Sequence, residues 1–322
     1  MEIFNQNKTY DFMSKRNLFV SISLLFIISS LVLIFTKGFN WGIDFKGGTV
    51  VQVRFETKAP LNKIRELVGK KYEGVSVTNF GSDKEVIIKF PVTTKNSVTK
   101  DMGDTISEIL KPLGKFEVRR VDIVGAKVGG ELTEKGIKAL TFAIIGILIY
   151  VAFRFEWSFA VASVLALVHD ITISLGFVSL FNIDVNLDVL AALLTILGYS
   201  LNDTIVVFDR IREEIVTTKQ RDLASLINSS VSKTLSRTTL TSLTTFFVVL
   251  TLYLFGGDII QPFSFTLLVG VIVGTYSSIF IASPLLIWLG FKIDDFRKNL
   301  AEKEKRKREK EKLRQQFEQG VM

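Results

Sequence analysis

The sequence predicts an α-helical membrane protein with six transmembrane helices and one α+β domain inserted between helices 1 and 2. Hydrophobic residues make up 48% of the 322 residues, and the mean hydropathy is +0.36, which is too apolar for an ordinary soluble protein. Six apolar runs are long enough to cross a bilayer. The one long polar stretch between the first two runs has the alternation of a small sheet domain.

The apolar runs give the predicted spans and domain boundaries. They cover residues 18–35, 137–153, 158–181, 187–208, 240–255 and 263–289. The fifth run is short unless its helix begins earlier, near Leu235. The first run follows Lys15 and Arg16 and lacks a small-residue cleavage site, so we expect an uncleaved helix. We therefore expect an N-terminal segment at 1–17, helix 1 at 18–36, the inserted domain at 37–135, helices 2–6 at 136–290 and a charged tail at 291–322.

The distribution of basic residues predicts the orientation in the membrane. The loops at 154–157 and 210–237 and the tail from 292 are rich in Lys and Arg. The short loops at 182–186 and 256–261 carry Asp184 and Asp258 and no basic residue. Basic loops stay on the cytoplasmic side. Both termini are therefore predicted to be cytoplasmic, and the inserted domain lies on the outer face.

The inserted domain has the pattern of a ferredoxin-like unit. Its segments read strand 49–57, helix 60–71, strands 75–80 and 85–90, helix 97–110 and strand 115–124. This order is that of a split βαβ fold. The edge of such a sheet can pair with an extended peptide, although the domain can equally be a rigid cap.

Glycines mark both joints between this domain and the membrane. Gly42, Gly47 and Gly48 lie in the segment after helix 1. The matching segment before helix 2 contains the glycines Gly125, Gly129 and Gly130. Glycine permits backbone conformations that other residues avoid, so these segments are candidate hinges. Ordinary turn chemistry is the alternative.

The fourth apolar run contains Asp203, the main candidate functional residue. It lies roughly 10 Å from the end of the run at 1.5 Å rise per residue. An ionised Asp near a membrane centre costs about 3 kcal/mol, and such residues usually face a bundle interior or a water path. Asp203 is therefore either a fixed, hydrogen-bonded carboxylate or a carboxyl group that gains and loses a proton.

Other polar residues surround this candidate in the sequence. Arg237, at the start of the fifth run, keeps its charge and can bias Asp203, or it can extend to lipid phosphate. Asn202 and Ser200 are small polar neighbours of Asp203. Thr241 belongs to a run of hydroxyl residues after Arg237 that can line a wet path or bond their own helix. The His169–Asp170 pair in the third run receives no primary role.

The composition excludes several function classes. The chain has no Cys and only one His, so disulfides are excluded and a metal site is not expected. No nucleophile–base set or phosphate loop is visible, so we expect neither an enzyme nor a bound cofactor. The net charge is +8, and the tail alternates Lys and Arg with Glu. This favours contact with anionic membrane lipids over nucleic acid.

Several motifs, in order, resemble a known family. They are GIDFKGG, IVGAKVGGEL, FRFEWSFAVASVLALVHD, GYSLNDTIVVFDRIRE and LSRTTLTSLTT. The chain is similar to the SecF family, membrane subunits of the bacterial Sec export machinery within the resistance-nodulation-division superfamily. The resemblance covers essentially the whole chain except the tail, and places the family's membrane Asp on Asp203 and its functional Arg on Arg237.

The resemblance implies a function and a set of partners. It implies an inner-membrane translocase subunit that works with SecD and the SecYEG channel and uses the proton-motive force to complete export of unfolded precursor polypeptides. The coupling ion, H⁺ or Na⁺, is left open. A small-molecule efflux unit of the same superfamily is the alternative, although one insert of roughly a hundred residues is small for a drug-binding domain. A scaffold that only stabilises the translocon is the third reading.

Overall fold

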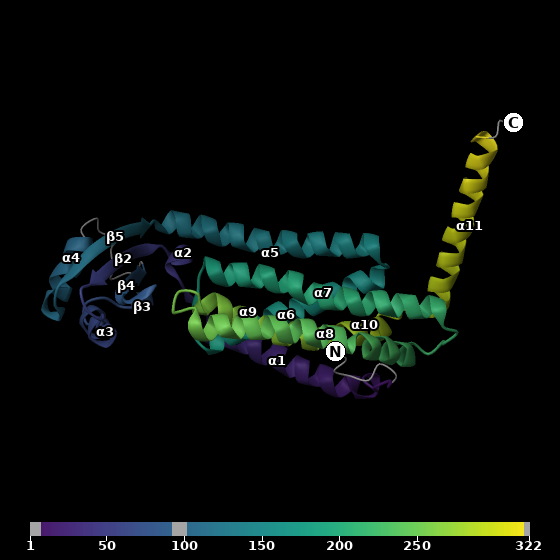
Figure 1. The fold of residues 1–322 in the computed structure, drawn as a ribbon, viewed down its shortest axis with the longest axis horizontal. Helices are drawn as coiled ribbons and strands as arrows, with labels where there is room; N and C mark the ends of the chain where they lie inside the picture. The colour runs from purple at the N-terminus through teal and green to yellow at the C-terminus, as the bar shows by residue number, and fades with distance from the viewer. Residues whose placement is uncertain (1–7, 92–101, 319–322) are drawn as a thin grey trace.

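The computed structural model describes residues 8–91 and 102–318. It places a sheet domain at one end of a long helical bundle and a separate helix, α11 (Ile293–Glu318), at the other end (Figure 1). Helix α5 runs from the sheet domain along the bundle (Figure 1).

Six helices in the described chain are long and apolar enough to cross a membrane. The helical elements that form them are α1 (Arg16–Thr36, after η1, Met13–Lys15), α5 (Ala126–Arg154), α6 (Trp157–Leu180), α7 (Leu187–Thr217), α8 (Leu223–Phe255) and α9 (Gln261–Ser277) with η3 (Ser278–Ala282) and α10 (Ser283–Trp288). The sixth span contains the wider π turn of η3 just before Pro284. Proline has no N–H to continue the regular α-helical ladder, which accounts for the irregular turn.

Two spans are longer than their apolar runs. Helix α5 starts at Ala126 and α8 starts at Leu223, well before residues 137 and 240. The first turn of α8 is capped by Asp222, whose carboxylate accepts a hydrogen bond from the Ser225 backbone N–H at 2.9 Å. Because the helices continue as polar turns beyond the hydrocarbon, hydropathy alone underestimates their length.

The bundle has an inner and an outer row of helices. At least half of the most apolar window of α6, α7 and α9 is buried within the chain, against less than a fifth for α1, α5 and α8. The main core cluster includes Phe159 of α6, Leu197 and Phe208 of α7, and Ala282 of η3. A polar group on the inward face of α7 is therefore surrounded by protein.

In its described residues, the sheet domain contains four antiparallel strands and two α-helices that pack on them. Its elements are β2 (Gly48–Phe55), α3 (Leu61–Gly69), β3 (Ser76–Phe80), β4 (Ser82–Pro91), α4 (Met102–Leu110, followed by η2, Lys111–Leu113) and β5 (Phe116–Val124). The strand order is β3-β4-β2-β5. Alternate residues such as Val51, Val53 and Ile88 are buried in the same core as Ile64 of α3 and Ile106 of α4.

One boundary of this domain differs from the sequence expectation, and another is not tested. Strand β4 begins at Ser82, so the turn from β3 is reduced to Gly81, which adopts φ +69°. A left-handed residue in such a short turn favours glycine. The first residues of the helix expected from residue 97 lie outside the described part of the chain.

The sheet domain also contacts the loops at the adjoining end of the bundle. Strand β1 (Asn40–Trp41) pairs in parallel with β6 (Asp184–Val185), and the Asn79 N–H donates to the Asp258 carboxylate at 3.2 Å. The short helix α2 (Ile43–Lys46) carries Asp44, which accepts from the Leu187 N–H at 3.0 Å. Burial raises the pKa of Asp184, opposed by nearby Lys89 and Ser76. The domain is thus seated on the membrane part and is not only tethered to it.

Candidate functional site

Asp203 lies where three helices meet. Its side chain is on the inward face of α7 and the residue is 2% exposed. Its Oδ2 accepts a hydrogen bond from the Ser242 hydroxyl of α8 at 3.1 Å. The Thr275 hydroxyl of α9 donates to Ser242 Oγ at 2.7 Å. The carboxyl group therefore faces protein hydroxyls and not lipid.

A second buried carboxylate lies close to the first. Asp170 on α6 is 0% exposed, and its Oδ2 accepts from Ser200 of α7 and, at 2.8 Å, from Ser277 of α9. Ser200 precedes Asp203 by three residues, about 4.5 Å along the helix. The sequence predicts that Ser200 supports Asp203, and it assigns Asp170 no primary role. In the structure Ser200 donates to Asp170, so Asp170 of α6 lies beside the turn of α7 that precedes Asp203.

His169 completes this second cluster. Its Nδ1 lies 2.8 Å from Asp170 Oδ1, and its ring stacks on Tyr276 with 6.4 Å between centroids. Within the described residues, His169 Nε2 is buried without a hydrogen-bond partner. The signal for this cluster was visible in the sequence, because a His–Asp pair in the middle of an apolar run is costly unless it is paired.

Helices α7 and α9 approach closely at this level because of glycines on α9. A Cβ on Gly270 would lie 2.2 Å from atoms of Ile196, and one on Gly274 would lie 3.0 Å from the Ser200 Cβ. Gly198 of α7, which the sequence marks as a small residue for close contact, has open space around it. The close packing that brings Ser200 and Ser277 to Asp170 therefore depends on α9.

Arg237 lies within electrostatic range of Asp203, at the end of the bundle where α7 ends. It is exposed and lines an open cavity of about 440 Å³. The other lining residues are Val206, Asp209, Arg210, Glu213, Lys233 and Thr234. In the part of the chain that the structure describes, no ion pair joins Arg237 to Asp203. Val206 follows Asp203 by three residues, about 4.5 Å along α7, so the cavity ends within about one helical turn of Asp203.

The other two predicted polar residues, Asn202 and Thr241, have surroundings that differ from each other. Asn202 is exposed on the outer side of α7, although its neighbour Asp203 is buried. Successive helical residues are about 100° apart, so the two cannot share a face. The Thr241 hydroxyl donates to the Arg237 and Thr238 carbonyls at 3.1 and 2.9 Å. Of the predicted residues, Asp203 lies in the hydroxyl cluster, while Asn202 and Arg237 lie at surfaces.

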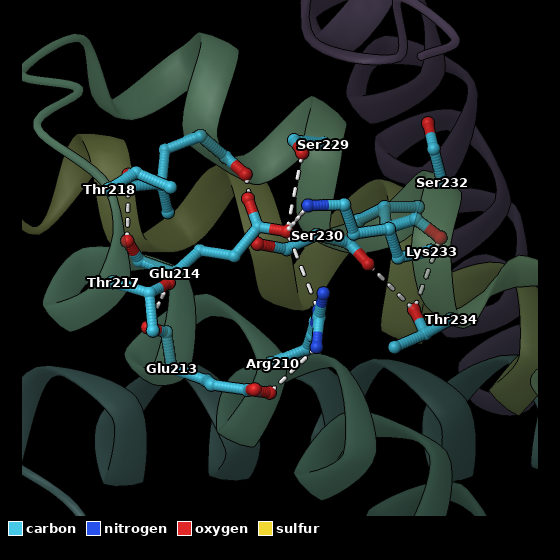
Figure 2. A network of polar contacts seen from close by, with 12 residues as sticks. Arg210, Glu213, Glu214, Thr217, Thr218, Ser229, Ser230, Ser232, Lys233 and Thr234 are labelled. Atoms are coloured by element: carbon cyan, nitrogen blue, oxygen red, sulfur yellow. Dashed lines mark hydrogen bonds and ion pairs between the residues drawn. The ribbon is translucent and has the colours of Figure 1, made fainter. Parts of the chain in front are cut away.

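A buried ion cluster on the same side of the bundle was not expected from the sequence. Glu214 of α7 is 3% exposed, and its Oε1 lies 2.6 Å from Lys233 Nζ, 3.2 Å from Ser229 Oγ and 3.4 Å from Arg210 Nε. Figure 2 shows these side chains converging on the Glu214 carboxylate from α7 and α8. A buried carboxylate with several donors is costly to break, so this cluster fixes one wall of the cavity.

The glycines after α1 lie at close backbone contacts. The Gly42 N–H donates to the Val185 carbonyl at 2.8 Å, which extends the β1–β6 pairing. Gly47 has φ +78°, a conformation that favours glycine. A Cβ on Gly48 would lie 2.2 Å from the Phe90 carbonyl oxygen. All three therefore meet a steric requirement where they stand, whether or not they also act as hinges.

The glycines before the second span are not equivalent to one another. Gly125 caps α5, while Gly129 and Gly130 lie within its first turns. A Cβ on Gly129 would lie 2.4 Å from the Phe45 carbonyl oxygen, whereas Gly125 and Gly130 face open space. Gly129 is the residue that lets α5 touch α2. The hinge role of this segment stays a prediction.

Six apolar helices around interior carboxylates and hydroxyls, with one extramembrane sheet domain, define a multi-pass membrane transport protein. The family model "Protein export membrane protein SecD/SecF, C-terminal" matches residues 105–292, and "SecD/SecF GG Motif" matches residues 32–59. The chain belongs to the SecF family of protein translocase subunits.

Individual relatives agree with this assignment. The chain is 49% identical over 322 residues to the protein translocase subunit SecF of Helicobacter pylori, covering 99% of both chains. It is 41% identical over 303 residues to SecF of Escherichia coli O157:H7, covering 92% of this chain and 93% of the relative. Among solved structures, SecDF from Thermus, described as a translocon-associated membrane protein, is 35% identical with a TM-score of 0.77. That likeness covers 89% of this chain but only 39% of SecDF.

Proposed function

We propose that this chain is the SecF-type subunit that couples the proton-motive force to late steps of protein export across the inner membrane. The observation that carries the proposal is the position of Asp203. It is buried among hydroxyls from two neighbouring helices, yet close to an open cavity at the inner end of α7. A carboxyl group in such a place can be neutral in one state and charged in another.

The proposed cycle moves protons inward through this carboxyl group. A proton from the outer side neutralises Asp203, whose bond from Ser242 stabilises the charged form. The proton then leaves through the cavity lined by Arg237. The fixed positive charge of Arg237 stabilises the carboxylate form of Asp203, which favours loss of the proton. One charge moved through 100 mV is worth about 2.3 kcal/mol, so a few protons per cycle can drive a conformational change.

We further propose that the sheet domain is a ferredoxin-like domain in the periplasm. Its helix and strand sequence and its strand order β3-β4-β2-β5 support this fold, and the basic inner loops support this side of the membrane. Movement at the glycine segments would carry the domain against an emerging precursor polypeptide. Its seating on Asp184 and Asp258 provides one defined resting position.

The proposed partners are SecD, the SecYEG channel, unfolded precursors and membrane lipids. The similarity to SecDF supports the SecD partnership, because SecDF is more than twice as long as the part that this chain matches. The exposed polar side chains of α7, such as Asn202, are surfaces that a second helical unit would cover.

The test compares two isosteric changes in inner-membrane vesicles that contain the complete complex. Asp203→Asn removes the titrating group, while Asp295→Asn makes the same chemical change at an exposed position on α11. We expect Asp203→Asn to abolish the stimulation of export by a proton gradient while partner binding is kept, and Asp295→Asn to have no effect. Full stimulation in Asp203→Asn would refute proton coupling through this residue. A protein that only stabilises the translocon would also keep full stimulation in Asp203→Asn.

A further inference from the structure

Helix α11 does not continue the direction of the sixth span. It starts near the end of α7 and runs across the bundle axis, away from the other helices (Figure 1). Its 26 residues correspond to about 39 Å at 1.5 Å per residue. A helix in this orientation runs along the plane of the membrane instead of into the cytoplasm.

The base of α11 is fixed to the bundle. Ile293 and Phe296 are buried. The Arg297 guanidinium donates to the Ile215 carbonyl at 2.9 Å and to the Thr218 carbonyl at 2.7 Å. These bonds satisfy carbonyls at the end of α7 that the helix itself leaves open. The direction in which α11 leaves the bundle is therefore set by specific contacts.

The exposed part of α11 is basic on one face. Residues 303–314 contain eight basic and three acidic residues, for a net charge of +5. At about 100° per residue, five of the basic residues fall within an arc of about 100° that contains no acidic residue. We call this face the basic stripe, and it consists of Lys303, Arg306, Lys307, Lys310 and Arg314.

The basic stripe continues the face by which α11 packs on the bundle. Phe296 and Leu300 belong to or pack against the membrane core cluster. Lys303, Lys307 and Lys310 follow Leu300 at spacings of three, four and three residues, which keeps them on that face. With the proposed orientation, this end of the bundle is on the cytoplasmic side, so the stripe faces the cytoplasmic leaflet beyond the bundle.

We propose that the basic stripe of α11 binds anionic phospholipid headgroups of the cytoplasmic leaflet. Negative headgroups attract basic residues within a Debye length of the surface. The ion pair between Lys307 and Glu311, 4.0 Å apart and largely exposed, costs little to exchange for a phosphate. This inference rests on the proposed lipid contact and inward orientation of the tail, and is independent of proton coupling. Bound in this way, α11 fixes the position of the bundle relative to the bilayer surface.

The first experiment uses the absence of Cys in the sequence, which allows single-Cys labelling of the full chain without other changes. Spin labels are placed on the stripe at Lys307→Cys or Lys310→Cys, and on the opposite face at Arg308→Cys or Lys312→Cys. The chain is reconstituted in nanodiscs of phosphatidylcholine with or without phosphatidylglycerol. We expect phosphatidylglycerol to lower severalfold the collision of stripe labels with a water-soluble nickel reagent. High salt should reverse this, and labels on the opposite face should not change.

A matched pair of triple variants separates the stripe from total charge. The stripe variant is Lys303→Glu with Lys307→Glu and Lys310→Glu. The control, Lys305→Glu with Arg308→Glu and Lys312→Glu, has the same net charge. With a label at Arg306→Cys, we expect the stripe variant to lose the lipid-dependent protection and the control to keep it, with α11 helical in both by hydrogen exchange. Equal loss in both variants, no protection by phosphatidylglycerol, or protection by added RNA alone would overturn the proposal. No partner or proton gradient enters these measurements, so they succeed or fail separately from the export test.

Discussion

The contact between α5 and α2 gives a sharp test of how the glycine joint works. In Gly129→Ala the new Cβ would lie 2.4 Å from the Phe45 carbonyl oxygen and 2.8 Å from its carbonyl carbon. Backbone atoms cannot rotate away, so α2 must move by about 1 Å to restore an ordinary contact. Overpacking of this kind costs about 1–3 kcal/mol.

Gly130→Ala is the matched control for this prediction. Gly130 is the next residue of α5 and has open space around its missing Cβ. Replacing a helical Gly by Ala gains up to about 1 kcal/mol in either position. That gain largely cancels between the two variants. The difference between their free energies of unfolding therefore reports on the contact with Phe45 and should be about 1–3 kcal/mol.

The measurement follows both the whole chain and the joint. Thermal unfolding of the purified chain should show a lower midpoint for Gly129→Ala than for Gly130→Ala. Hydrogen exchange of residues 39–48 should be faster only in Gly129→Ala, because Phe45 also contacts Trp41 with 5.6 Å between ring centroids. Equal behaviour of the two variants would show that the close approach is unimportant. Equal loss of export in both, without a change in stability, would instead favour flexibility of the segment.

Two further predictions concern the C-terminal end of α7 and the N-terminal end of α8. Glu214→Gln keeps the shape of a buried side chain but removes its charge, and should lower the free energy of unfolding by about 1–2 kcal/mol. Glu213→Gln, at a side chain that is 58% exposed, should change it by less than about 0.5 kcal/mol, and equal effects would contradict the role of burial. The hydrogen bonds from Ser225 lower the pKa of Asp222, so the capping stabilisation is present above the unfolded pKa and is lost as pH falls through the folded pKa. Asp222→Ala should remove about 1 kcal/mol at neutral pH and make acid unfolding less steep, and an unchanged acid limb would refute the capping argument.

The sequence predicts the positions of the membrane spans better than it predicts where their helices begin and end. The spans follow from hydropathy, because a bilayer requires a minimum length of apolar helix. Their ends do not: α5 and α8 start many residues earlier than their apolar runs. A polar helical turn has the same composition as a polar loop. Only capping residues such as Asp222 mark the boundary, and these are weak signals on their own.

The candidate site shows the same division. Asp203 stands out because an acidic residue in an apolar span is costly. The surroundings of these residues could not be predicted, because each contact joins two different helices. Examples are Asp203 with Ser242, Ser200 with Asp170, and Glu214 with Lys233.

The sequence by itself determined which segments can enter a membrane and which carboxyl group is out of place in lipid. These properties depend on the free energy of transfer of each residue, which is local. The tertiary structure alone decided that Asp203 and Asp170 share a hydroxyl-lined interior, that Asn202 and Arg237 lie at surfaces, and that α11 turns across the bundle. Those outcomes depend on how neighbouring helices are rotated and how they cross. Close contacts between helices, such as that of Gly270 with Ile196, fix this arrangement, and the sequence of one segment alone does not encode it.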